Sequence, residues 1–322
     1  MPTNLTPRAR SGARRSLVRI GGVLAVTVVA ALVAVRPVQA APAPRASRGS
    51  AAAVIDDTLA GRSGKLRARF VVPSTSGLFA YLRRLLGDSV ETRPGVYTAP
   101  ADATSRPFTY IAMLPFAQKV DGRIGAYRIG FWPAEWGRVQ AARLANPKYG
   151  NPAGFIQVTP DNAETAVSEH FRLRDFLTHD QVRVWPKYLV LDAGLVDKLE
   201  LVLAELRAQG YRADRLHVMS GFRTPQYNGR GGDTRGRAEL SRHQYGDAAD
   251  VWVENGNGTM ADLTGDGRVD ARDAAVLAAA AERVEQAHPD LVGGVGVYRG
   301  TRAHGPFVHI DTRGNRARWG AG

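Results

Sequence analysis

Residues 307–311 read Phe-Val-His-Ile-Asp, a segment in which apolar and polar side chains alternate. In a β-strand successive side chains point to opposite faces, so His309 and Asp311 would share one face, and Val308 and Ile310 the other. The apolar pair can pack in a core while the polar pair faces a cleft. The pattern therefore predicts a strand in a sheet that is covered on one face and lined with polar groups on the other.

A second polar stretch lies at residues 241–250, which read Ser-Arg-His-Gln-Tyr-Gly-Asp-Ala-Ala-Asp. Small residues, Gly246 among them, permit close backbone approach, so that His243 on a loop and Asp250 at a strand start can converge. Together with His309 they form a set of two imidazoles and one carboxylate, which leaves a fourth zinc position open for water. We expect a catalytic zinc site. The alternative is that these are hydrogen-bonded polar residues at strand ends.

The chain has 322 residues, seven histidines and no cysteine. The absence of cysteine excludes a disulfide scaffold, a thiolate zinc site, a cysteine nucleophile and a lipidated N-terminal cysteine. Any metal must therefore be held by His, Asp or Glu. The hydrophobic fraction of 44% and the charged fraction of 23% are ordinary for a globular protein and exclude wholesale disorder.

Three ordered elements resemble the signatures of the M15 zinc metallopeptidases, a family of D-Ala-D-Ala carboxypeptidases and related peptidoglycan endopeptidases. Residues 241–250 are similar to the first zinc signature, Ser-x-His-x-x-Gly-x-Ala-x-Asp, and residues 307–311 to the second. Residues 220–225, Ser-Gly-Phe-Arg-Thr-Pro, together with Asn228, are similar to an upstream element of the family. The resemblance covers about residues 170–322.

This resemblance implies a role for each matching residue. The implied zinc ligands are His243, Asp250 and His309. Arg223 matches a family arginine that faces the site, where its guanidinium would hold a substrate carboxylate or a developing oxyanion; the alternative is a structural ion pair. Two further residues are expected near the substrate: Ser241, which would orient the loop around the first histidine rather than act as a nucleophile, and Tyr298, which would line the cleft or belong to the core.

The sequence departs from the family pattern at the general base. Some members of the superfamily carry Glu or His three residues before the last zinc histidine, and here that position is Pro306. His304 and Asp311 are the candidates in its place. Asp311 could act as the base or as the hydrogen-bonding partner of a zinc histidine, and His304 could act as the base if its loop folds over the metal. Glu254 is the next candidate if neither serves.

Residues 262–273 fit the spacing of an EF-hand calcium loop. Side-chain oxygens fall at positions 1, 3, 5, 9 and 12, with glycine at position 6 and valine at position 8. The loop resembles that of dockerin modules, but only one copy is present, so cohesin binding is not expected. The alternative is a polar turn that caps the helix expected at 274–287. The expected calcium ligands are Asp262, Thr264, Asp266, Arg268, Asp270 and Asp273.

Residues 1–40 have the three-part layout of a secretory signal: a basic segment, an apolar run at 20–35 and a small-residue cleavage site at 38–40. The Arg-Arg pair at 14–15 fits a twin-arginine signal, and an ordinary arginine-rich export signal fits equally well. We expect a cleavable signal peptide, so that the membrane matters only during export. The protein would then act in the periplasm, in the cell wall or outside the cell.

The formal net charge of +13 falls to +7 when the six arginines of residues 1–40 are set aside. No stretch combines clustered basic residues with interleaved aromatics, so no nucleic-acid partner is expected. Residues 41–61 are rich in Ala, Pro, Ser and Arg and predict a flexible linker.

Two regions follow the linker. Residues 62–150 predict a small β-rich domain of unknown role, with a short helix at 78–86 and a turn at Asp121-Gly122 between strands at 116–120 and 124–132. In residues 155–322 helix and strand patterns mix, including an amphipathic helix at 195–209. We expect an α+β fold: a zinc peptidase domain with a small mixed or antiparallel sheet, preceded by the β-rich domain.

The expected function is hydrolysis of peptidoglycan stem peptides by zinc-activated water, as a D,D-carboxypeptidase or a D,D-endopeptidase. Zinc would lower the pKa of its water toward ~7 and polarise a carbonyl. Three alternatives stay open: cleavage of another peptidoglycan bond by the same residues, a non-catalytic peptidoglycan-binding protein with a structural zinc, and a protein held together mainly by calcium. The sequence does not indicate an oligomeric state.

Overall fold

The computed structural model describes residues 68–73, 77–99, 108–137, 146–232, 234 and 237–320. The expected signal peptide and linker lie outside these residues. The chain divides into two units, Met1–Ser47 and Arg48–Gly322, and all the described residues belong to the second. Within the described part of the chain, no helix combines the length and the apolar character needed to cross a membrane.

The largest sheet has five strands in the order β13-β11-β12-β10-β9. β11 pairs parallel with β13, and the other three pairings are antiparallel, so the sheet is mixed. The strands run over Arg215–Ser220 (β9), Ala248–Glu254 (β10), Gly294–Tyr298 (β11), Phe307–Asp311 (β12) and Ala317–Gly320 (β13). The described fold is mixed α+β, as the sequence predicts.

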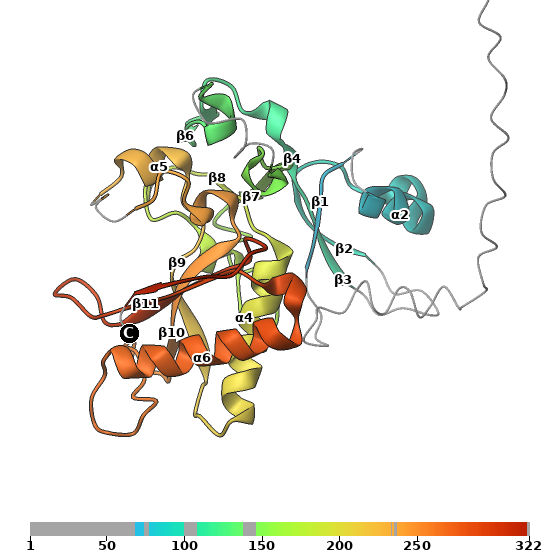
Figure 1. Cartoon of the computed structure of the whole chain (residues 1–322). Coiled ribbons are helices and arrows are strands. Elements are labelled where there is room, and N and C mark those ends of the chain that lie inside the picture. Colours follow the sequence, from blue (N-terminus) through green and yellow to red (C-terminus); the bar gives the residue numbers. More distant parts are fainter. Residues whose placement is uncertain are drawn as a thin grey trace, which may run out of the picture. The chain divides into compact units, whose positions relative to one another are not determined.

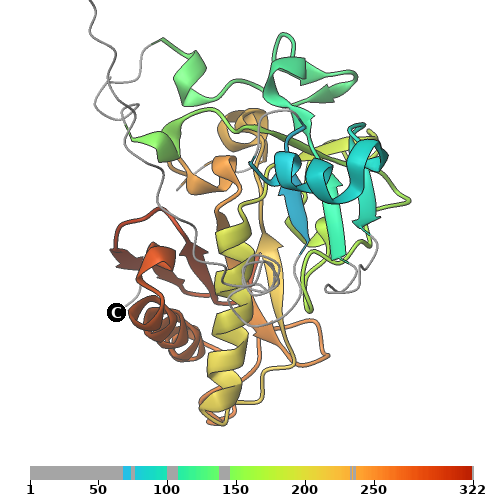
Figure 2. The same cartoon turned by 90° about the vertical axis from the view of Figure 1, so that its right-hand side faces the viewer.

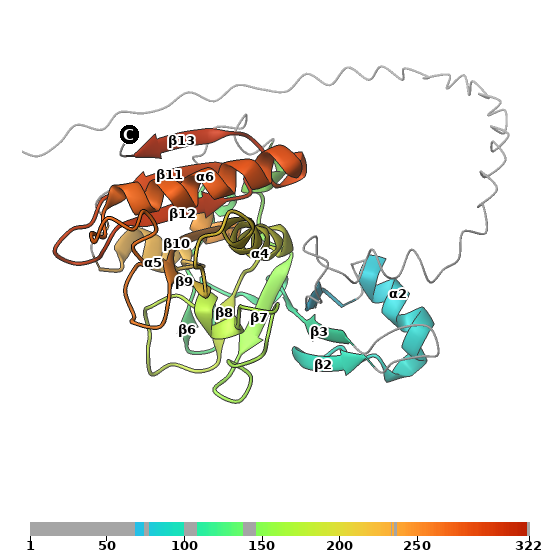
Figure 3. The same ribbon diagram turned by 90° about the horizontal axis from the view of Figure 1, so that it is seen from below.

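Two long helices, α4 (Ala193–Ala208) and α6 (Ala271–Ala287), cross and contact each other and pack against this sheet (Figures 1 and 3). Figure 2 shows α4 along its length and α6 nearly end-on. Each begins at an aspartate whose carboxylate accepts backbone N–H bonds of the first turn, Asp192 for α4 and Asp270 for α6. A buried ion pair joins the helices, because Nζ of Lys198 lies 2.6 Å from Oε1 of Glu285.

The alternation in β12 divides the sheet into an apolar face and a polar face. Val308 and Ile310 are fully buried and belong to the same core as Leu199 of α4 and Leu277 of α6. The polar residues between them, and those of β10, therefore project from the face that the two helices do not cover. The candidate metal-binding residues Asp250 and His309 lie on that second face.

Residues before 160 form smaller sheets. One has the order β1-β3-β2. Its strands are Arg69–Val71 (β1), Gly95–Ala99 (β2) and Phe108–Ala112 (β3), and helix α2 (Gly77–Leu86) lies between β1 and β2 in the sequence. Another joins β4 (Leu114–Pro115) to β7 (Gly154–Val158) and β7 to β8 (Lys187–Leu189). A hairpin joins β5 (Arg123–Ile124) and β6 (Tyr127–Arg128), and α5 spans Pro225–Arg230.

The pairing of β4 with β7 crosses the division that the sequence suggests near residue 150. The main buried core also draws on both sides of it, for example on Ile111 and Trp132 as well as on Leu199. A smaller cluster around Leu82 and Phe108 belongs to the first three-stranded sheet. The expected strand at 116–120 is instead a 3₁₀ turn at Phe116–Gln118, and the hairpin begins after it.

Candidate metal centre

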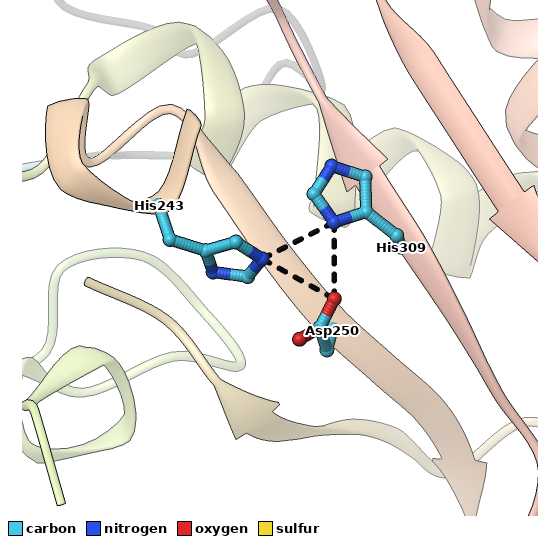
Figure 4. Close-up of side chains that lie close together, drawn as sticks. All are labelled: His243, Asp250 and His309. Atoms are coloured by element: carbon cyan, nitrogen blue, oxygen red, sulfur yellow. Dashed lines mark hydrogen bonds and ion pairs between the residues drawn. The ribbon is translucent and has the colours of Figure 1, made fainter. Parts of the chain in front are cut away.

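Strands β10 and β12 bring Asp250 and His309 directly opposite each other. Side chains of directly opposed residues in an antiparallel pair lie on the same face and within contact distance. Oδ1 of Asp250 lies 3.0 Å from Nδ1 of His309 (Figure 4). The strand register alone therefore joins two of the three residues that the sequence singles out.

His243 reaches the same place from the 3₁₀ turn η6 (Arg242–Tyr245), which enters β10 through Gly246. Gly246 has φ +70, and a Cβ there would come within 2.2 Å of the carbonyl oxygen of Val190. Only glycine fits both conditions. The turn is fixed from the other side by Arg223, whose backbone N–H donates to the carbonyl of His243.

The three candidate ligand atoms form a compact triangle. Nε2 of His243 lies 3.1 Å from Nδ1 of His309 and 3.3 Å from Oδ1 of Asp250, and the third side is the 3.0 Å contact described above. Tetrahedral zinc with bonds of about 2.0–2.1 Å holds its ligand atoms about 3.3 Å apart. All three residues are buried. The triangle therefore has the size and donor set of a metal site, although it does not identify the metal.

Each histidine also contacts an oxygen through its other ring nitrogen. Nδ1 of His243 lies 2.7 Å from the carbonyl oxygen of Gly221, and Nε2 of His309 lies 3.0 Å from Oδ2 of Asp311. Metal-binding histidines are commonly held in this way, because the outer hydrogen bond fixes the ring orientation and the tautomer. The contacts leave Nε2 of His243 and Nδ1 of His309 as the ligating atoms.

Asp311 is completely buried and is held from several sides. Its carboxylate accepts the N–H of Gly294 at 2.7 Å and the guanidinium of Arg313. Its backbone carbonyl accepts Nζ of Lys198 at 2.7 Å. Both carboxylate oxygens are thus already engaged, and the residue has no exposed surface.

Arg223 follows β9 and lies against the triangle. Its Nη2 is 2.6 Å from Oδ2 of Asp250 and 3.1 Å from Nε2 of His243, and its Nε donates to Oγ of Ser220. A β-bulge between the paired positions of β9 and β10 places Ser220 opposite Asp250. The guanidinium therefore borders the position that a metal would take, with its side chain 14% exposed.

Burial and the ion pairs set the charge of this cluster. Burial lowers the pKa of His243 to about 4. Burial acts in the same sense on His309, but hydrogen bonds to Asp250 and Asp311 outweigh it and raise the pKa of His309 above its ordinary value. Burial would raise the pKa of Asp250, yet the two histidines hold it well below its ordinary value. At neutral pH, Asp250 and His243 are therefore in the forms that bind metals.

The remaining candidate residues lie farther from the triangle. Tyr298 stacks on Phe307 with ring centroids 4.5 Å apart, and His304 packs edge-on against the same ring at 5.0 Å. Nδ1 of His304 contacts the carbonyl of Gly305. Ser241 is buried at the start of η6, where its carbonyl accepts the N–H of Gln244.

The position of Trp319, on β13 beside the triangle, was not predicted from the sequence. Its ring lies 5.1 Å from the ring of His309, and its indole N–H donates to the hydroxyl of Tyr298 at 2.8 Å. The ring occupies the space over Gly296, where a Cβ would come within 2.3 Å of the indole nitrogen. Gly296 lies opposite His309 in the sheet. The Gly-x-Gly spacing in residues 294–296 was the available signal that a bulky ring covers this strand.

In residues 262–273, the expected calcium loop, the carboxylates form hydrogen bonds and ion pairs with other groups of the protein. Asp262 accepts the N–H groups of Gly265 and Gly267, and Asp273 accepts those of Leu263, Thr264 and Asp270. Nη2 of Arg272 lies 2.6 Å from Asp266 and 2.8 Å from Asp270. Arg268 is exposed, and its N–H donates to Asp266. The loop thus caps α6 and pairs with an arginine of that helix.

A second compact group of possible ligands consists of Glu169, His170 and Glu200. Nδ1 of His170 lies 2.7 Å from Oε2 of Glu200, and Nη1 of Arg207 lies 3.2 Å from Nε2 of His170. In this structure the ring of His170 is therefore held between a carboxylate and a guanidinium.

Comparisons of the chain with protein-family models, with curated proteins and with solved structures found no match.

Proposed function

We propose that this protein is an exported zinc peptidase that hydrolyses peptidoglycan stem peptides between D-residues. The single observation that supports it most is the triangle of His243, Asp250 and His309, in which each imidazole has a fixed outer partner. Two imidazoles and one carboxylate leave a zinc coordination position for water or substrate. The similarity of the three sequence elements to the M15 signatures supports the substrate class.

Bound zinc would polarise a peptide carbonyl and lower the pKa of its water to about 7. Arg223 borders the triangle with a guanidinium that can donate to a substrate carboxylate or to an oxyanion. Asp311 holds the ring of His309 in register. Trp319, which is 36% exposed, lies beside His309, and its indole N–H donates to the hydroxyl of Tyr298.

The contacts favour His304 as the general base over the other two candidates. Asp311 is fully buried and engaged by Arg313 and Gly294. Glu254 lies at the far end of β10, where it accepts the N–H groups of Gly256 and Gly258 and pairs with Arg215. His304 lies on the loop that precedes β12 and is only partly buried, so it is the candidate whose position depends on that loop.

One observation favours a second candidate, a non-catalytic peptidoglycan-binding protein with a structural zinc. Pro306 stands where the superfamily carries a base, and no imidazole or carboxylate among the described residues, other than the ligands and Asp311, has a contact with the triangle. Turnover separates the two candidates, because both would bind zinc.

A soluble stem peptide ending in D-Ala-D-Ala tests the proposal. We expect the zinc-loaded protein to release D-Ala, and the Asp250→Asn variant to lose at least 100-fold in kcat/KM. An exposed carboxylate far from the triangle, changed in Asp161→Asn, provides the matched control. Zinc binding without hydrolysis of this peptide or of crosslinked peptides would favour the second candidate.

We also propose that residues 262–273 bind calcium, with the ligands expected from the EF-hand spacing. Calcium would have to displace Arg272 from Asp266 and Asp270, which are its present partners. The site would therefore be weak. A rise in melting temperature on addition of millimolar calcium, reversed by a calcium-selective chelator, would support it, and an unchanged melting temperature would refute it.

A further inference from the structure

A pocket of about 460 Å³ lies between the segment that follows β6 and helix α5. Phe131 and Trp136 line it from the first segment, and Gln226 and Asn228 from the helix. Gln244 also lines it, and this residue directly follows the candidate ligand His243 in η6. The pocket and the metal centre are therefore two sides of one short turn.

The two walls are fixed to each other by hydrogen bonds. The N–H of Gln226 donates to the carbonyl of Ile129 at 2.9 Å, and the indole N–H of Trp132 donates to the carbonyl of Gln244 at 2.9 Å. At Gly130, with φ +86, a Cβ would come within 2.6 Å of the backbone nitrogen of Gln226. The close approach of the walls thus requires glycine, and the pocket is preformed.

Asn228 is a buried polar residue in the lining of this pocket. Its side chain is 5% exposed, and its Nδ2 donates to the carbonyl of Ala238 at 3.1 Å. Oδ1 is buried and has no partner among the described residues. A buried carbonyl without a donor costs about 1–3 kcal/mol. Binding that opened this position to an O–H or N–H group would recover that cost.

The remaining lining indicates the kind of ligand. Phe131 is 49% exposed, and the indole N–H of Trp136 donates to the backbone carbonyl of Phe131, which fixes the position of the Trp136 side chain. The side-chain amides of Gln226 and Gln244 supply donors and acceptors. Arg230 and Glu239 place one charge of each sign at the edge, which favours a ligand without net charge. Aromatic surfaces beside amide groups suit a ring with apolar C–H faces and polar edges.

We propose that this pocket binds an uncharged saccharide unit that carries hydroxyl and acetamido groups. The inference builds on the proposed function, since such sugars form the glycan strands to which peptidoglycan stem peptides are attached. Held there, a sugar would lie next to the turn that carries His243 and would present its peptide to the metal centre. The segment before residue 150 would then contribute directly to substrate binding.

The test measures saccharide binding by calorimetry, with the full mature protein and the β-1,4-linked tetramer of N-acetylglucosamine as the probe. We expect binding that Phe131→Ala and Gln226→Ala weaken at least tenfold, because they remove the stacking surface and an amide. Val182→Ala, which changes a 74% exposed apolar side chain away from the pocket, should bind as the wild type does. Cellotetraose, which lacks acetamido groups, should bind more weakly. Melting curves check that each variant is folded.

No binding at millimolar saccharide, or equal binding by wild type and Phe131→Ala, would overturn the inference. Hydrolysis of a glycan-free stem peptide, measured in parallel, separates this result from the proposed function. If that peptide is cleaved and the saccharide is not bound, the peptidase stands and the sugar site falls. If the saccharide is bound in the expected variant order and no peptide is cleaved, the sugar site stands and the peptidase falls.

Discussion

Oδ2 of Asp311 lies 3.0 Å from Nε2 of His309, the ring nitrogen on the far side from Asp250 and His243. The two residues are separated by one position on β12, so the strand alternation alone places them on the same face. Asp311 thereby sets which nitrogen of His309 is free to bind a metal.

We expect Asp311→Asn to weaken metal binding by 10–100-fold, the usual cost of removing the outer partner of a ligating histidine. Competition with a chromogenic chelator measures the affinity. Asp161→Asn, an exposed aspartate, is the matched control. Undiminished affinity in a folded Asp311→Asn protein would show that His309 needs no such partner.

Arg223→Lys should reduce kcat/KM on a stem peptide by about 100-fold, because lysine keeps the charge but loses the fixed fork of donors. Metal content should stay near one per chain, since Arg223 contacts the ligands without being one. Elemental analysis and steady-state kinetics are read on the same preparation. Loss of metal in this variant would instead assign the arginine to the structure of the centre.

The metal-free protein should become less stable as the pH falls from 6.5 toward 4. Burial lowers the pKa of His243 to about 4 in the folded state, whereas in the unfolded chain it is near 6.5. In this range the unfolded state binds more protons, so the free energy of unfolding rises with pH, by up to about 1.4 kcal/mol per pH unit.

Urea unfolding in EDTA at pH 4.5, 5.5 and 6.5 measures this dependence. Other groups titrate as well, so the comparison is with His243→Gln, which lacks the buried imidazole. The slope of stability against pH should be smaller in the variant. Equal slopes in the two proteins would mean that His243 is protonated in the folded state.

Arg272→Ala should increase calcium affinity at residues 262–273, because it frees Asp266 and Asp270 from their ion pairs. We expect an increase of about tenfold, equivalent to about 1.4 kcal/mol. Calorimetric titration with calcium measures it, and Asp262→Ala provides the negative control. Absence of calcium binding in both wild type and Arg272→Ala would identify the loop as a helix cap only.

The sequence predicted the local elements around the site because their patterns are local. The alternation in residues 307–311 and the helix expected at 195–209 correspond to β12 and to α4. The convergence of His243, Asp250 and His309 also agrees with the expectation drawn from their spacing.

The features that the sequence did not predict depend on contacts between residues that are far apart in the chain. The position of Trp319 beside His309 follows from the parallel pairing of β13 with β11, and the final four-residue strand carries little pattern of its own. The pocket between α5 and Phe131 likewise arises from the docking of two segments about 100 residues apart. The 3₁₀ turn at Phe116–Gln118 stands in place of the expected strand and begins directly after Pro115, the last residue of β4.

The central claim is tested most directly by measuring metal content and peptidoglycan digestion side by side, on the protein purified without chelator. We expect about one zinc per chain and the release of D-Ala or the loss of crosslinks, both abolished in His309→Ala and both retained in His288→Ala. Failure to bind zinc at saturating concentration, or equal digestion by wild type and His309→Ala, would contradict the assignment of a catalytic zinc to His243, Asp250 and His309.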